Sequence, residues 1–211
     1  MTLLAFDFDN TLSDSMMLVL LCQRCGVSEQ NREITERVHA GELGYADSLR
    51  ERVSLLSSCT RADLHTVCEQ IHLRPGAPSL LRQLHRSAVT IVIISGGFER
   101  CIERVLDRYE LAVDRIFANQ LVIRDGTLTG DVTGPLVEQT KETVIQNFAA
   151  DSAEIHEPIV AVGDGRTDRP LLDVADISIG FQPESTLRSH CDFITSDIQE
   201  VQTVLESENI I

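Results

Sequence analysis

Near the N-terminus, residues 3–9 read LLAFDFD, an apolar run that leads directly into Asp7 and Asp9. A run this short and this apolar predicts a strand that is buried on both faces. The two aspartates are two positions apart, so in an extended chain their side chains point to the same side. The segment therefore predicts a buried strand that presents two carboxylates to one site at its carboxyl end.

Two later segments repeat this arrangement of an apolar strand followed by polar or glycine residues. Residues 89–94 lead into Ser95-Gly96-Gly97, and residues 159–162 lead into Gly163-Asp164-Gly165. Helical and strand patterns alternate along this part of the chain, which predicts an α/β fold with a doubly wound, parallel, Rossmann-like sheet. In such sheets the ligand binds beyond the carboxyl ends of the strands. We therefore expect the three polar strand ends to form one site.

Residues 14–73 interrupt this alternation, because they show helical periodicity and no strand pattern. We expect them to form a small helical cap, or lid. The α/β core is then built from residues 1–13 and 74–211.

Within the core, Asp125-Gly126 predicts the turn of a β-hairpin flap. Its strands are expected at residues 121–124 and 127–132, after a separate short strand at residues 115–118. Residues 137–149 follow with a helical pattern.

Composition excludes some classes of partner. The chain has 18 Lys and Arg against 33 Asp and Glu, which gives a net charge of −15. A protein that binds nucleic acid or anionic membrane in general would have the opposite sign. No apolar run approaches the ~20 residues of a membrane span, and the N-terminus lacks the pattern of a signal peptide. We expect a cytoplasmic protein that binds neither nucleic acid nor membrane, and the sequence leaves its oligomeric state open.

The cysteines are sparse, at Cys22, Cys25, Cys59, Cys68, Cys101 and Cys191. Without an export signal, reduced thiols are expected. Cys22 and Cys25 have the C-x-x-C spacing of some zinc and redox sites, but they lie in a helical pattern and no second C-x-x-C follows. We expect them to be small, buried or half-buried side chains, and the sequence assigns them no role.

The acidic strand ends favour a divalent cation. Asp7 and Asp9 on one strand, with Asp164 and Asp168 on its neighbour, repel one another unless a hard cation binds among them. Carboxylate and carbonyl oxygens are the ligands that Mg²⁺ prefers, and a bound cation polarises a phosphate. The alternative is that the acids only solvate a loop.

The other polar groups favour a phosphate. Ser95 and the amides of Gly96 and Gly97 can cradle an anion, and Lys141 can add an ammonium. Taken singly, the glycines could only form a turn and the lysine could lie on the surface. Together with the carboxylates, they form the set of groups that phosphoryl transfer requires.

Four ordered motifs carry a resemblance to the haloacid dehalogenase superfamily, and within it to the phosphoserine phosphatases. They are Asp7-Phe8-Asp9-Asn10-Thr11, Ser95-Gly96-Gly97-Phe98, Lys141 and Gly163-Asp164-Gly165-Arg166-Thr167-Asp168. The resemblance extends over nearly the whole chain, including residues 41–43 and 48–56 in the lid, Phe117-Ala118-Asn119, and the hairpin at 125–130.

The resemblance implies a Mg²⁺-dependent phosphomonoester hydrolase. Asp7 would attack phosphorus to form an aspartyl-phosphate and would also bind the metal. Asp9 would protonate the leaving group and then activate water, while its backbone carbonyl binds the metal. Asp164 would be the third protein ligand, and Asp168 would support the metal shell.

The remaining site residues would bind the substrate, a small phosphate ester. Ser95, Gly96 and Lys141 would hold its phosphoryl oxygens. Thr11 and Thr167 belong to the first and fourth motifs and are expected in the substrate site. Thr167 stands where the family usually has Asn, and Thr reaches less far.

The larger departure is Met16. Phosphoserine phosphatases usually have a Glu there that pairs with the substrate ammonium, while an Arg matching Arg52 binds its carboxylate. Loss of one partner of a buried ion pair costs ~3–5 kcal/mol. We therefore expect a carboxylated substrate for Arg52 with an uncharged group near Met16, unless Asp14 replaces the missing Glu. His39 and Tyr45 also stand at lid positions that are usually apolar.

Other activities fit parts of the pattern. A phosphotransferase would pass the phosphoryl group to an alcohol instead of water, and both reactions share the first step. A phosphate-binding regulator without turnover would be favoured by loss of Asp7 or Asp9, and both are present. A dehalogenase that attacks carbon would not need the Ser95 and Lys141 phosphate cradle.

Overall fold

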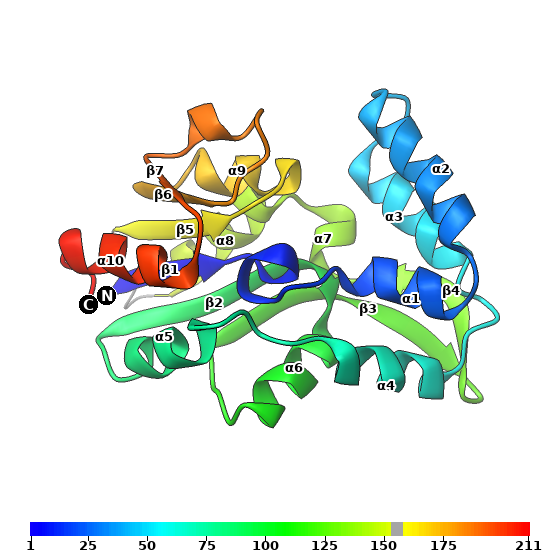
Figure 1. Cartoon of the computed structure of the whole chain (residues 1–211). Helices are drawn as coiled ribbons and strands as arrows, with labels where there is room; N and C mark the ends of the chain where they lie inside the picture. The colour runs from blue at the N-terminus through cyan, green and yellow to red at the C-terminus, as the bar shows by residue number, and fades with distance from the viewer. Residues whose placement is uncertain (153–157) are drawn as a thin grey trace.

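The computed structural model describes residues 1–152 and 158–211, which form an α/β fold around one sheet (Figure 1). Its strands are β1 (Thr2–Phe6), β2 (Val89–Phe98), β3 (Arg115–Arg124), β4 (Thr127–Thr133), β5 (Ile159–Gly163), β6 (Ile177–Phe181) and β7 (Phe193–Thr195). They lie in the order β4-β3-β2-β1-β5-β6-β7. All neighbouring pairs are parallel except β3 and β4. The predicted doubly wound parallel sheet is confirmed.

The alternation of side chains along β1 explains why its sequence is apolar throughout. Leu4 and Phe6 belong to one apolar cluster, and Leu3 and Ala5 belong to another on the opposite face. All four are fully buried. Successive residues of a strand point to opposite faces, so a strand covered on both sides needs apolar residues at every position.

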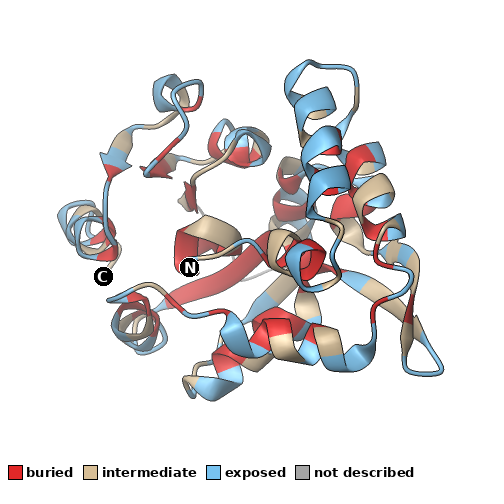
Figure 2. Cartoon of the chain, turned by 45° about the vertical axis from the view of Figure 1, so that its right-hand side comes forward, coloured by how far each residue is buried: buried red, intermediate tan, exposed pale blue. Residues whose placement is uncertain are grey.

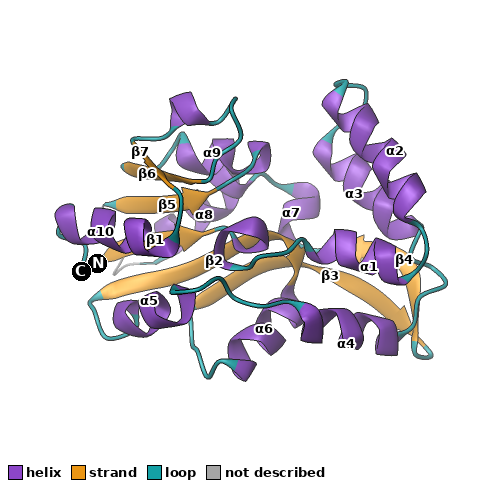
Figure 3. Ribbon diagram, viewed as in Figure 1, coloured by secondary structure: helices purple, strands orange, loops and turns teal. Residues whose placement is uncertain are grey.

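Helices cover both faces of the sheet (Figure 3). One face carries α5 (Ala77–Leu84), α6 (Glu99–Arg108) and α10 (Ile198–Ser207). The other carries α7 (Pro135–Glu138), α8 (Lys141–Asp151) and α9 (Arg169–Leu172). Figure 2 shows buried residues gathered along the strands and on the sides of the helices that turn toward them. None of the described helices has the length and apolar character of a membrane-spanning segment.

The segment 14–73 is helical, as predicted. It consists of α1 (Met17–Arg24), α2 (Ser28–His39), α3 (Tyr45–Ser54) and α4 (Arg61–Gln70). Its ends lie side by side, because Ser13 and Leu73 form a β-bridge. Figure 1 shows α2 and α3 on the side opposite the chain termini, where α3 packs against β4 and α7. Apolar residues of the segment join the same continuous cluster as β1, so its treatment as a separate domain stays a prediction.

Some predicted boundaries differ. Residues 115–124 form one strand rather than two, because the polar residues Asn119 and Gln120 do not interrupt the strand. Asn119 is fully buried and donates a hydrogen bond to the Gly96 carbonyl (3.1 Å). β2 continues through Gly96 and Gly97 to Phe98, with a register shift after Ser95.

The helical stretch predicted at 137–149 is divided into α7 and α8. The hydroxyl of Thr140 accepts a hydrogen bond from the Thr143 amide, so α8 begins at Lys141. The hairpin turn is as predicted, with left-handed φ values of 48° at Asp125 and 81° at Gly126.

The expectation of reduced thiols is wrong for four cysteines. Cys25 is bonded to Cys59 and Cys68 to Cys101, while Cys22 and Cys191 are free. The bonded residues are 34 and 33 positions apart in the chain. Only the tertiary fold brings them together, so spacing along the sequence carried no signal. The second disulfide joins α4, in the helical segment 14–73, to α6 on the face of the sheet.

Candidate active site

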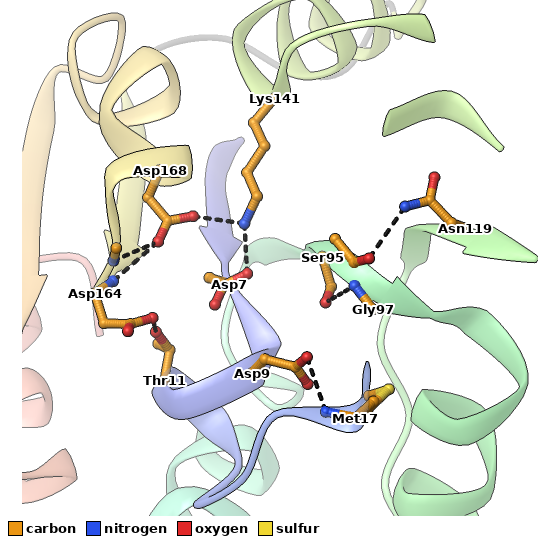
Figure 4. A network of polar contacts seen from close by, with 12 residues as sticks. Asp7, Asp9, Thr11, Met17, Ser95, Gly97, Asn119, Lys141, Asp164 and Asp168 are labelled. Atoms are coloured by element: carbon orange, nitrogen blue, oxygen red, sulfur yellow. Dashed lines mark hydrogen bonds and ion pairs between the residues drawn. The ribbon is translucent and has the colours of Figure 1, made fainter. Parts of the chain in front are cut away.

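The three polar strand ends converge (Figure 4). Asp7 directly follows β1, and its amide donates a hydrogen bond to the Val162 carbonyl at the end of β5 (2.8 Å). Asp164 follows β5, and Ser95 lies near the end of β2. The sheet topology therefore gathers residues from distant parts of the chain at one edge.

Asp9 reaches the site by a different route from the one predicted. The chain does not continue straight from β1, because it kinks within the tight turn Phe8–Leu12, where Asp9 has an extended backbone (φ −66°, ψ 126°) and Asn10 has a φ of 61°. Asp9 is held by the backbone amide of Met17, which donates to its Oδ2 (3.1 Å). Its Oδ1 is buried and has no hydrogen-bond partner among the described residues.

Lys141 lies at the centre of the carboxylate cluster. It is the first residue of α8, only 5% exposed, and its ammonium binds Oδ1 of Asp7 and Oδ1 of Asp168 (2.5 Å to the latter). The other oxygen of Asp168 accepts from the amides of Asp164 (3.0 Å) and Gly165 (2.9 Å). The interpretation of Lys141 as a surface lysine is therefore excluded.

The acidic residues fit a hard divalent cation. Carboxylate oxygens of Asp7, Asp164 and Asp168 lie within 4.8 Å of one another. Both oxygens of Asp168 are already engaged by Lys141 and backbone amides, which leaves Asp7 and Asp164 better able to bind a metal directly. The Thr11 hydroxyl donates to Asp164 (3.0 Å) and so orients that carboxylate. This oxygen-only donor set matches Mg²⁺.

Burial and mutual repulsion raise the pKa values of these carboxyl groups. Burial, then the charge of Asp168, raises the pKa of Asp7 well above its usual range, and Lys141 offsets part of this rise. The same two causes raise the pKa of Asp164 to about 6, and burial raises that of Asp9 to about 7. Burial lowers the pKa of Lys141, but Asp168 and Asp7 outweigh it, so the net shift is upward and the ammonium stays charged.

The last part of β2, from Ser95 to Gly97, forms the opposite wall. Ser95 is buried, and its Oγ accepts a hydrogen bond from the Gly97 amide (3.0 Å). A methyl group on Gly97 would lie 2.9 Å from the Met17 sulfur and 3.3 Å from an Asp9 oxygen. A side chain here would therefore displace the Met17 side chain and crowd Asp9. Asn119, which holds the Gly96 carbonyl, belongs to the stretch 117–119 that resembles the phosphoserine phosphatases, but no role in the site was predicted for it.

Comparison with known proteins agrees with this geometry. The model of the family "haloacid dehalogenase-like hydrolase" matches residues 4–173. The chain belongs to this family. This hydrolase is 40% identical over 210 residues to the phosphoserine phosphatase of Halobacterium salinarum, with all of both chains covered.

Solved structures of phosphoserine phosphatases have a similar fold over nearly the full length of this chain. A phospho-aspartyl intermediate analogue of phosphoserine phosphatase superposes with a TM-score of 0.85 at 29% identity, covering 96% of this chain and 97% of the other. A substrate-bound phosphoserine phosphatase complex gives a TM-score of 0.86 at the same identity and coverage. The predicted resemblance is confirmed, and the hydrolase is a phosphatase of this family.

The predicted substrate residues outside this network occupy varied positions. The Arg52 guanidinium on α3 is half-buried, its Nε has no partner among the described residues, and burial lowers its pKa. Met16 precedes α1 and is 43% exposed. Asp14 is exposed and accepts a hydrogen bond from the Ser15 hydroxyl (2.6 Å). Thr167 is also exposed.

The raised pKa values predict how stability depends on pH and Mg²⁺. A carboxyl group whose pKa is higher in the folded state favours folding when protonated, so its contribution is lost as pH rises through the folded pKa. The metal-free hydrolase should therefore lose stability between about pH 5 and pH 8 as Asp164 and Asp9 ionise. Mg²⁺ should raise the free energy of unfolding by ~2.7 kcal/mol when its concentration is a hundred times its dissociation constant.

Urea unfolding at about pH 5 and about pH 8, each with EDTA or with saturating Mg²⁺, measures this dependence of stability on pH and Mg²⁺. At the lower pH, protons occupy the same carboxylates, so stabilisation by Mg²⁺ should be much smaller. Asp164→Asn is the control and should lose most of the Mg²⁺ effect at the higher pH. An equal Mg²⁺ effect at both pH values would contradict the assignment.

Proposed function

We propose that this hydrolase removes phosphate from a small, carboxylated phosphomonoester, with Mg²⁺ as cofactor and a covalent aspartyl-phosphate on Asp7. The observation that carries this proposal is the Asp7 carboxylate, buried at the end of β1 and held by the Lys141 ammonium. The cytoplasmic location and transfer to water rather than to an alcohol are parts of the same proposal.

In the first step an oxygen of Asp7 attacks phosphorus and the bond to the ester oxygen breaks. Asp9 gives its proton to the departing alkoxide. A pKa of about 7 suits this role, because the group can donate a proton and then accept one near neutral pH. In the second step the Asp9 carboxylate takes a proton from water, which attacks phosphorus, frees Asp7 and releases phosphate.

Charge stabilisation supplies the rest of the catalysis. Ser95, the Gly96 amide and Lys141 would bind the phosphoryl oxygens, and Thr11 would act by orienting Asp164. Asp7, Asp164 and the backbone carbonyl of Asp9 would hold Mg²⁺, with Asp168 supporting that shell. When bound, Mg²⁺ would neutralise negative charge on the phosphoryl group.

The substrate is proposed from the lid residues and the relatives. Arg52 has a buried, unpartnered donor, and a buried polar group without a partner is unusual in a folded protein. A substrate carboxylate would satisfy it by a charge-assisted hydrogen bond. The full-length relative is named a phosphoserine phosphatase, which makes phosphoserine the first substrate to test. Met16 supplies no charge for an ammonium, so a substrate with an uncharged group there is expected to react faster.

Replacement of the nucleophile tests the chemistry. Asp7→Asn should lower kcat for any phosphate ester by about a thousandfold or more, since the amide cannot form the covalent intermediate. Phosphate release is the measurement, and Asp107→Asn, which changes an exposed carboxylate on α6, is the control. Retained activity in Asp7→Asn would refute the proposed nucleophile.

Replacement of Met16 tests the substrate. Met16→Glu should raise kcat/KM for phosphoserine at least about tenfold, the effect of ~1.4 kcal/mol of restored ion pairing. Phosphoglycolate, which has no ammonium, should not gain. Met16→Gln is the neutral control of similar size. No gain with phosphoserine would show that Asp14 or another group already serves the ammonium.

A further inference from the structure

Tyr45 is a lid residue that the reaction described above does not use. It begins α3, and Arg52 lies seven positions later on the same helix. Seven residues make almost two full turns, so the two side chains leave the same face of α3. Arg52 is the proposed partner of the substrate carboxylate, so Tyr45 lies on the face of α3 that turns toward the substrate.

The Tyr45 hydroxyl contacts the end of β2 at Gly96, which is proposed to bind the phosphate. A methyl group added to Gly96 would overlap the hydroxyl oxygen and would lie 3.5 Å from the ring carbon that bears it. Gly96 follows Ser95, and its carbonyl is fixed by Asn119 (3.1 Å). The hydroxyl therefore lies directly over a wall of the site whose position is fixed.

This hydroxyl has no hydrogen-bond partner within the described ranges 1–152 and 158–211, although buried tyrosine hydroxyls usually find one. The side chain as a whole is 39% exposed, so its ring is not locked in the core. The charged groups that act on the hydroxyl are Arg52 and four residues of the carboxylate cluster, which are Lys141, Asp7, Asp9 and Asp168.

The protonation state decides what this group can offer. Burial raises the pKa of Tyr45 to about 12, because the nearby carboxylates add to this rise while the Lys141 ammonium offsets part of it. The hydroxyl therefore keeps its proton at neutral pH and serves as a hydrogen-bond donor, not as a base. Phosphoryl oxygens are strong acceptors, and a phosphoryl group bound between Asp7 and the end of β2 at Ser95 would bring them next to this donor.

We propose that the Tyr45 hydroxyl donates a hydrogen bond from the lid to a non-bridging oxygen of the substrate phosphoryl group. α3 then binds both ends of the substrate, with Tyr45 at the phosphate and Arg52 at the carboxylate. This inference rests on the proposed function, and it makes Tyr45 a substrate-binding residue whose contact depends on the lid lying over the core.

Tyr45→Phe tests the proposal, because it removes the hydroxyl and keeps the ring. With p-nitrophenyl phosphate as substrate, kcat/KM should fall about tenfold to a hundredfold, the range for loss of a donor to a charged acceptor. Inorganic phosphate, which carries only the phosphoryl end, should bind at least about fivefold more weakly by calorimetry with Mg²⁺ present. Tyr109→Phe, which removes the hydroxyl of the chain's other tyrosine, should change neither value.

Two results would overturn the inference. One is phosphate affinity and kcat/KM in Tyr45→Phe within about twofold of the unchanged enzyme. The other is that Tyr45→Leu weakens phosphate binding while Tyr45→Phe does not, since that would assign Tyr45 a packing role only. Calorimetry with phosphate needs no turnover, so a chain that hydrolyses no phosphate ester would refute the proposed function and still leave the Tyr45 contact measurable.

Discussion

The buried ammonium of Lys141 among the aspartates is the interaction on which the arrangement of this molecule depends. Asp7 and Asp168 are almost completely buried, and each contacts Lys141. Buried charges are tolerated only when they are paired and hydrogen-bonded, and removal of one partner costs ~3–5 kcal/mol. The fold must therefore bring three elements together so that these charges pair: the end of β1, the loop after β5 and the first turn of α8. This pairing fixes the geometry of the site before any ligand binds.

The charge balance also explains why the site is prepared for phosphate chemistry. Lys141 compensates only part of the carboxylate charge, and the pKa values of Asp7, Asp9 and Asp164 remain raised. Such a cluster gains free energy by binding a divalent cation. Arg52 and Tyr45 lie on one face of α3, and the Cys68–Cys101 disulfide ties neighbouring helix α4 to α6. The groups proposed to bind substrate thus come from the strand ends and from the helical segment 14–73.

Much of this could be read from the sequence, because parallel strands buried on both faces leave a distinctive signal. The apolar runs before Asp7, Ser95 and Asp164 predicted the strands, and the topology of such sheets predicted that their ends meet. Asp125-Gly126 predicted its turn because both residues must adopt left-handed backbone conformations. These features depend on local chemistry or on a general rule of topology.

What the sequence did not reveal depends on contacts between distant residues. Asn119 looks like a break in a strand until its amide is seen holding the Gly96 carbonyl. The disulfide partners are separated by more than thirty positions. The route of Asp9 to the site depends on a turn at Asn10 and on the Met17 amide. The burial of Lys141 likewise could not be predicted from the sequence of its own helix, because the carboxylates that bind it follow β1 and β5.

A crystal structure with Mg²⁺ and beryllium fluoride, a mimic of a phosphoryl group, tests the central claim most directly. We expect the beryllium to be bonded to a carboxylate oxygen of Asp7, with Mg²⁺ also bound to Asp164 and the fluorides near Ser95 and Lys141. The mimic bound to any other residue, or an ion that does not contact both Asp7 and Asp164, would contradict the account.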